Sequence, residues 1–153
     1  MVNSAITHLS VSSELALEFL ATFSRLEYAL KVTGFLQPNN NEAKADWKRF
    51  VSELEDKFKP KNLNDFNFLL GYKLNMLGNV NNSIVWVEFD TSKAKNSIEN
   101  VTLKIKQIRN NLFHGGKFAP FENSNDKKLL EASINVLLEI KSTLQIVNSA
   151  YDY

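Results

Sequence analysis

The amino-acid sequence predicts an all-α protein, an up-and-down helical bundle of four to five helices with a central, partly extended insertion. Apolar side chains recur at steps of three and four residues through most of the chain, which is the period of a helix. Only residues 84–89 form a run rich in β-branched and aromatic side chains, and one such segment does not make a sheet. With 153 residues, no internal repeat and no clear linker, the chain is expected to form one domain, residues 1–153.

The first two helices follow from their apolar stripes and their end signals. The first is expected to begin at Ser12 or Ser13, either of which can cap it, and to end at Thr33 before Gly34. Its stripe consists of Leu15, Phe19, Phe23, Leu26 and Leu30. The second is expected over residues 42–59, before Pro60, with Trp47, Val51, Leu54 and Phe58 on one face.

The middle of the chain is less regular. Residues 64–78 fit either period: six apolar residues from Phe66 to Met76 alternate as in a strand, whereas Leu69, Lys73 and Leu77 also allow a helix. We prefer a helix because helices flank the segment. Residues 79–83 are expected to form a turn, and residues 84–89 to be extended.

Two helices complete the bundle. The first is expected over residues 92–113, followed by Gly115-Gly116; its stripe consists of Ile98, Val101, Ile105, Ile108 and Leu112. The last helix is capped near Ser124 or Asn125. It is expected to bury Leu130, Ile134, Leu137, Leu144 and Val147.

Composition excludes several classes of protein. Hydrophobic residues make up 44% and charged residues 23%, which is ordinary globular usage. The chain has no cysteine, so disulfides, thiolate metal sites and a cysteine nucleophile are excluded, and two histidines are too few for a histidine-rich metal site. No segment resembles a secretory signal or is long enough to span a bilayer, so we expect a cytoplasmic protein with no membrane partner.

Charge is concentrated in one place. The net charge is only +1, but residues 93–117 hold six basic residues against the single acidic Glu99, a local excess of five. Taken alone, this excess is better explained by a solvated helix face than by a nucleic-acid partner.

The run from Arg109 to Lys117, Arg-Asn-Asn-Leu-Phe-His-Gly-Gly-Lys, lies inside this basic segment and combines residues suited to phosphodiester chemistry. Arginine stays charged, whereas histidine exchanges a proton near neutral pH. On an unbroken helix, His114 lies about 140° around the axis from Arg109, which is poor geometry for gripping one phosphate. The two residues meet only if the helix gives way at Gly115-Gly116, or if a second subunit contributes. Otherwise Arg109 forms a surface salt bridge and His114 merely precedes a glycine cap.

Arg109-Asn110, three further residues and His114 resemble the Arg-Asn-x-x-x-His signature of HEPN domains (higher eukaryotes and prokaryotes nucleotide-binding). The longer run through Lys117 is similar to the bacterial branch found in plasmid, mobile-element and defence contexts. Residues 23–31 also resemble the first long helix of that branch, whereas residues 60–92 have no clear counterpart.

The resemblance implies a HEPN-like helical bundle that forms a homodimer, with both motifs facing a shared cleft. It also implies RNA as substrate, cleavage without a metal or other cofactor, and an antitoxin or defence-system partner. Arg109 would bind the scissile phosphate, and His114 would act as general acid or base while the ribose 2′-hydroxyl attacks. Asn110 would orient the histidine or the motif backbone. The tyrosine that often stands two residues after the histidine in toxins controlled by a nucleotidyltransferase is replaced by Gly116.

Four further residues are candidate substrate contacts: Glu27, Lys106, Asn111 and Lys117. The two lysines can contact phosphate. Glu27 lies at the edge of the first helix's apolar stripe, where it can pair with Arg109 across the bundle and fix its rotamer, or else remain solvated.

Three functions compete on this evidence. The leading hypothesis is a HEPN-type endoribonuclease of a toxin–antitoxin or anti-phage system. The alternative is a non-catalytic HEPN domain that binds RNA or nucleotide, or that serves as a dimerisation module. A helical adaptor unrelated to HEPN domains would instead point Arg109 and His114 into separate regions of solvent.

Overall fold

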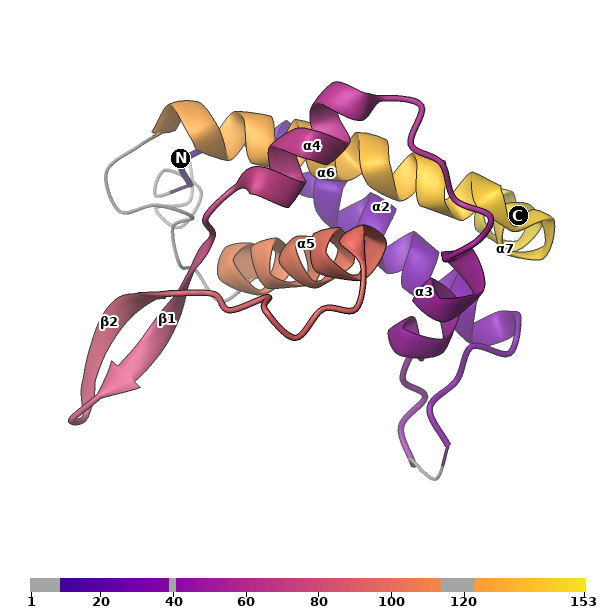
Figure 1. The fold of residues 1–153 in the computed structure, drawn as a ribbon, viewed down its shortest axis with the longest axis horizontal. Coiled ribbons are helices and arrows are strands. Elements are labelled where there is room, and N and C mark those ends of the chain that lie inside the picture. Colours follow the sequence, from indigo (N-terminus) through magenta and orange to yellow (C-terminus); the bar gives the residue numbers. More distant parts are fainter. Residues whose placement is uncertain (1–8, 39–40, 114–122) are drawn as a thin grey trace, which may run out of the picture.

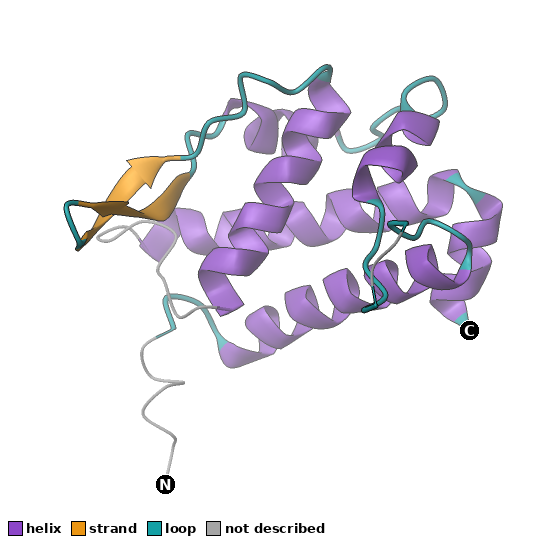
Figure 2. Ribbon diagram, turned by 90° about the horizontal axis from the view of Figure 1, so that it is seen from below, coloured by secondary structure: helices purple, strands orange, loops and turns teal. Residues whose placement is uncertain are grey.

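The computed structural model describes residues 9–38, 41–113 and 123–153. These residues form six helices and one antiparallel hairpin, with the helices packed together and the hairpin projecting from one end (Figure 1). The expected all-α class is therefore wrong: the fold is mixed, because residues predicted as helix and insertion pair as two strands (Figure 2).

Helix α2 (Ser13–Val32) confirms the first predicted helix. The Ser12 hydroxyl accepts a hydrogen bond from the Leu15 amide at 3.2 Å, as an N-cap does. The helix ends at Thr33, and Gly34 follows with a φ of 93°, the left-handed conformation that glycine adopts without strain. Its buried stripe faces α6 (Asn123–Thr143) and α7 (Gln145–Asp152), whose backbones lie alongside it (Figure 1).

Helix α3 (Trp47–Leu54) is shorter than the predicted helix over residues 42–59. Before it, the chain doubles back: Leu36 and Ala45 form an antiparallel bridge, and the Asp46 amide donates to the Phe35 carbonyl at 2.8 Å. These bonds hold the residues before Asp46 out of a helix. The Asp46 carboxylate then caps α3 by accepting from the Arg49 amide at 3.0 Å.

Helix α4 (Leu63–Gly71) ends seven residues before the predicted boundary at Gly78, and strand β1 (Asn75–Val80) follows it. The deciding contacts are the hydrogen bonds of a local hairpin. Asn81 and Asn82 have φ values of 51° and 62°, a two-residue turn that pairs β1 with β2 (Ser83–Glu88) in register from Asn75↔Glu88 to Val80↔Ser83. The prediction of a helix over residues 75–78 is thus wrong, whereas the turn and the extended segment are confirmed.

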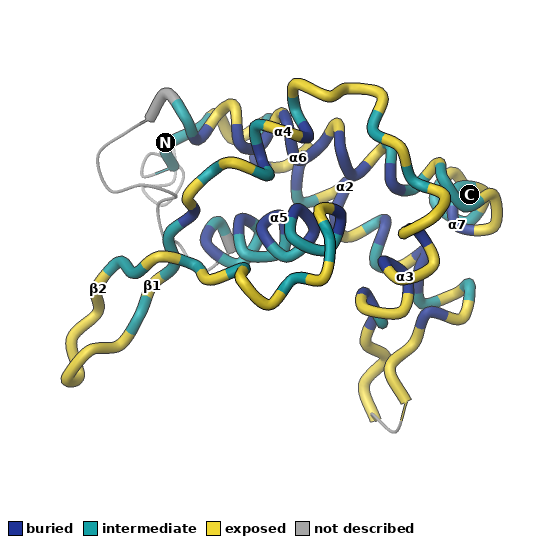
Figure 3. The backbone as a smooth tube through the Cα atoms, in the orientation of Figure 1, coloured by how far each residue is buried: buried dark blue, intermediate teal, exposed yellow. Residues whose placement is uncertain are grey.

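Helix α5 (Ser97–Phe113) begins five residues later than predicted because Asn96 caps it. The Asn96 side-chain oxygen accepts from the Glu99 amide at 2.9 Å. The apolar stripe of α5 packs against α2, α3, α4 and α6. Figure 3 shows this arrangement as buried inner faces on the helices, in contrast to the mostly exposed hairpin.

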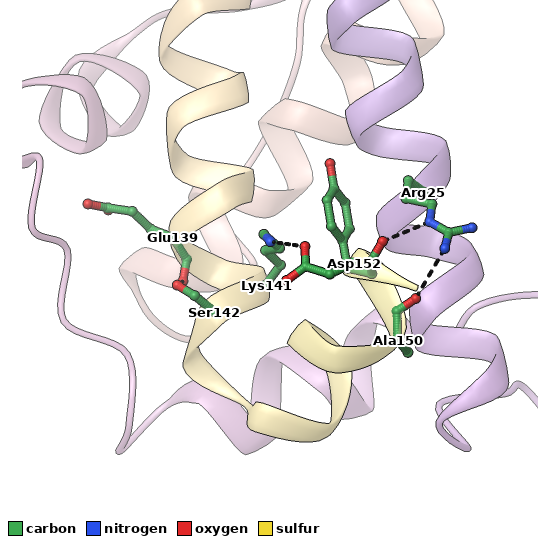
Figure 4. Close-up of polar contacts among 7 residues, drawn as sticks. Arg25, Glu139, Lys141, Ser142, Ala150 and Asp152 are labelled. Carbon is green, nitrogen blue, oxygen red and sulfur yellow. Dashed lines mark hydrogen bonds and ion pairs between the residues drawn. The ribbon is translucent and has the colours of Figure 1, made fainter.

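The predicted last helix is two helices, α6 and α7, separated at Leu144, whose backbone is extended. The hydroxyls of Ser142 and Thr143 both donate to the Glu139 carbonyl, an alternative to the helical ladder at this point. Helix α7 folds back onto α2, where the Arg25 guanidinium donates to the Tyr151 carbonyl at 2.8 Å and to the Ala150 carbonyl at 3.5 Å (Figure 4). The break therefore lets the C-terminal residues complete the core around Val147.

Candidate functional site

Arg109 lies on α5 where that helix passes α2. Its guanidinium carbon stands 5.3 Å from the centre of the Phe23 ring, and Nη1 donates to the Asn110 side-chain oxygen at 2.8 Å. Nη2 lies 3.6 Å from Oε1 of Glu27. The side chain is 35% exposed, so its stem packs while part of the guanidinium reaches the surface.

Glu27 reaches this site from α2 and is held from two directions. Besides the ion pair with Arg109, its Oε2 accepts a hydrogen bond of 3.2 Å from the indole Nε1 of Trp47 on α3. Trp47 is itself buried and stacks on Phe23, with ring centres 5.4 Å apart. The sequence left open whether Glu27 pairs with Arg109 or remains solvated; the structure shows the pair, and a third helix orients the carboxylate.

Lys106 lies one helical turn before Arg109, and its Nζ stands 6.0 Å from the centre of the Trp47 ring. Burial lowers the pKa of this lysine below its ordinary value. The nearby Glu27 carboxylate opposes that shift, and the Arg109 charge adds to it. Lys106 is thus a partly desolvated cation in the electrostatic field of the Glu27–Arg109 pair.

These contacts define the Arg109 cluster: Phe23, Glu27, Trp47, Lys106, Arg109 and Asn110. Two cations share one carboxylate, which leaves an excess of one positive charge. The aromatic rings beneath keep water from one side of the cations, so an added anion is screened less than it would be on an open surface. A single phosphodiester carries the charge that balances the cluster.

The other motif residues have different surroundings. Asn110 accepts from Arg109, so it orients the arginine; its predicted effect on the histidine remains untested. Asn111 is only 4% exposed, accepts from the Gln107 side chain and donates to the Asn75 carbonyl at 2.8 Å. The structure therefore places Asn111 in a packing role at the base of the hairpin, away from the substrate contact that was expected.

His114 and Lys117 lie outside the described residues. The relation of the imidazole to Arg109, and the contact of Lys117 with phosphate, stay predictions. Helix α5 keeps its backbone helical through Phe113, so any change of direction that brings His114 to Arg109 starts after that residue.

Trp47 is a residue of this site that the sequence did not single out. Its position on the apolar face of α3 predicted a core side chain, and it is one. The available signal was chemical: a buried indole N–H requires an acceptor, and Glu27 lies at the edge of the apolar stripe of α2.

Comparison with known protein families, with curated proteins and with solved structures finds no match for this chain. The resemblance to HEPN domains therefore rests on the residues quoted for it. Among the described residues, no three histidine or acidic side chains gather as a metal site, and none of the described helices has the length and apolar character needed to cross a bilayer.

Proposed function

We propose that this protein is a HEPN-type endoribonuclease that cleaves RNA without a metal, acting in a toxin–antitoxin or anti-phage setting. The observation that carries the proposal is the Arg109 cluster. Its arginine belongs to the Arg-Asn-x-x-x-His run, and a second cation and an orienting carboxylate lie within the same partly buried site.

In this mechanism Arg109 binds a non-bridging oxygen of the scissile phosphate, and Lys106 adds positive charge beside it. The ribose 2′-oxygen attacks phosphorus while the bond from phosphorus to the 5′-oxygen breaks. The proton of the 2′-hydroxyl passes to a base, and the 5′-oxygen receives one from an acid; His114 serves in one of these steps. The products are a 2′,3′-cyclic phosphate and a 5′-hydroxyl.

Glu27 acts on Arg109 rather than on RNA. Because Trp47 fixes one carboxylate oxygen, the other presents a stationary negative charge to the guanidinium. That charge restricts the rotamers of Arg109 before RNA arrives, which lowers the entropy lost on binding. Glu27 is therefore a positioning residue in this proposal.

The test is cleavage of a labelled single-stranded RNA by the full chain in the presence of EDTA. Matched reactions use His114→Ala, Arg109→Ala and, as an exposed control on the loop after α4, Lys73→Ala. We expect cleavage by the parent protein and the control, and a loss of at least a hundredfold in the two motif variants. A substrate with a single 2′-deoxy sugar at the cleaved position should resist cleavage.

Two results would contradict the mechanism: cleavage that requires added metal, or cleavage that survives His114→Ala undiminished. RNA binding that depends on Arg109, with no cleavage at any pH, would instead favour the non-catalytic RNA-binding domain. The cation excess of the Arg109 cluster is compatible with that second function, because phosphate binding needs no proton transfer.

A further inference from the structure

The β1–β2 hairpin projects beyond the helices (Figure 1), and much of it is exposed (Figure 3). Several of its apolar side chains are not covered by the described part of the chain. Ile84 is 78% exposed, and Leu77, Val80 and Val85 are also exposed. A two-stranded hairpin is marginally stable by itself, and exposed apolar strands normally mark a surface where another chain binds.

The register shows which backbone groups are available on β2. In a hairpin with a two-residue turn, the residues beside the turn form a hydrogen-bonded pair, and the pattern alternates from there. Ser83, Val85 and Val87 therefore bond to β1, and Ile84, Trp86 and Glu88 direct their amides and carbonyls outward. The described residues supply no third strand to receive them.

The opposite edge is different. The Asn75 carbonyl, at the outer edge of β1, accepts a hydrogen bond from the Asn111 side chain of α5 at 2.8 Å. Helix α5 thus covers the start of β1, whereas none of the described residues pairs with the outer edge of β2. Natural edge strands usually carry lysine, proline or a bulge to prevent pairing, and β2 has none of these.

Charge selects the occupant of this edge. Glu88 is the single charged residue in the two strands, so the hairpin lacks the cations that RNA requires. A second copy fits instead. When two β2 strands pair antiparallel about a two-fold axis at Trp86, the two Trp86 residues are opposite each other, and Val85 is opposite Val87. Each Glu88 then lies opposite Ile84 of the other copy, so no like charges meet.

We propose that this protein dimerises by pairing β2 with β2 of a second copy, centred on Trp86, to form a four-stranded antiparallel sheet. This interface is independent of the chemistry proposed for the Arg109 cluster. It predicts a concentration-dependent dimer in which residue 84 of one copy is next to residue 88 of the other.

The test uses the full chain and sedimentation velocity over a range of concentrations. Ile84→Glu and Ile84→Lys change the same exposed side chain but have opposite effects at this interface. Glutamate opposes Glu88 twice in each dimer and should weaken dimerisation about tenfold, whereas lysine faces Glu88 twice and should preserve or tighten the dimer. The matched controls are Leu17→Glu and Leu17→Lys on α2, at a side chain that is 68% exposed.

Circular dichroism verifies that each variant is folded. Ile84→Pro is a second probe: it removes an outward amide without removing a bond between β1 and β2, and it should also weaken the dimer. A parent protein that stays monomeric at every concentration overturns the proposal. It does so even if β2 turns out to bind a different protein. Equal effects of glutamate and lysine at position 84, or an equal loss from Leu17→Glu, overturn it as well.

Discussion

Replacing Lys104 by methionine tests how helix α4 is brought to an end before the hairpin. The lysine is buried on α5, and its Nζ donates to the Leu69 carbonyl at 3.0 Å and the Leu70 carbonyl at 2.6 Å. These are carbonyls of the last turn of α4, where a cation is favoured by the helix dipole. Methionine keeps most of the buried stem but donates no hydrogen bond.

The expected loss follows from what each carbonyl retains. Leu69 also accepts from the Tyr72 amide, so its loss is partial. The Leu70 carbonyl accepts its hydrogen bond from Lys104 among the described contacts, so the substitution removes that bond. A hydrogen bond from a charged donor contributes about 1.5–3 kcal/mol. Removal of a desolvated charge offsets part of this loss. We expect Lys104→Met to lower the free energy of unfolding by about 2 kcal/mol, and the melting temperature by roughly 4–8 °C.

The assay is urea unfolding at pH 7, followed by far-ultraviolet circular dichroism and tryptophan fluorescence, with exposed Lys73→Met as the control. The control should lie within about 0.5 kcal/mol of the parent protein. An unchanged or raised midpoint for Lys104→Met would refute the reasoning, because it would mean that desolvation of the ammonium outweighs its two hydrogen bonds.

The effect of Lys104→Met on the free energy of unfolding should also depend on pH. Burial lowers the pKa of Lys104 in the folded state below its ordinary value of 10.5. Between the lowered pKa and 10.5 the unfolded chain binds more protons, so the contribution of Lys104 to stability rises with pH. The difference in unfolding free energy between the parent and Lys104→Met should therefore be larger at pH 10 than at pH 7. A smaller difference at pH 10 would contradict the assigned direction.

Three further predictions concern the site and the hairpin. Lys106→Ala should reduce the slope of log affinity for single-stranded RNA against log salt by about 0.7, measured by fluorescence anisotropy; an unchanged slope would remove Lys106 from the binding site. Glu27→Gln should cost less than about 1 kcal/mol in urea unfolding, because its pair with Arg109 is partly exposed; a larger loss would show a more deeply buried pair. Asn82→Gly should slow amide exchange in the hairpin, whereas Asn82→Val should accelerate it, because residue 82 has a φ of 62°; equal exchange in both would argue against this turn.

Local signals predicted much of the helical part of the fold. Ser12 and Gly34 mark the ends of α2 within a residue. The apolar stripes of α2 and α5 are buried as expected, apart from the partly buried Leu15 and Leu112. Boundaries failed where pairing with a neighbouring segment supplied the deciding contact. The bridge between Leu36 and Ala45 delays α3, and the hairpin closed at Asn81-Asn82 makes residues 75–78 a strand where a helix was expected.

In the candidate site, too, some contacts followed from helical periodicity and others depended on how the helices pack. The place of Glu27 at the edge of the α2 stripe made its pairing with Arg109 one of two open alternatives, because helical periodicity determines which side chains flank a packed face. The part played by Trp47 was not predictable from its own helix. Its indole bond to Glu27 depends on how α3 approaches α2, and no local pattern contains that approach.

The sequence by itself determined where the main helices α2, α3, α5 and α6 lie, which of their faces are apolar, and that arginine, asparagine and histidine occur together in a basic segment. These properties depend on contacts within a few residues, which periodicity and capping record. Tertiary structure alone decided that Asn111 is buried and bonded to the hairpin, that Lys106 is partly buried beside Glu27, and that residues 75–80 pair with residues 83–88 as strands. The first two depend on segments distant in sequence and the third on pairing across a turn, because burial and strand pairing are properties of packed neighbours.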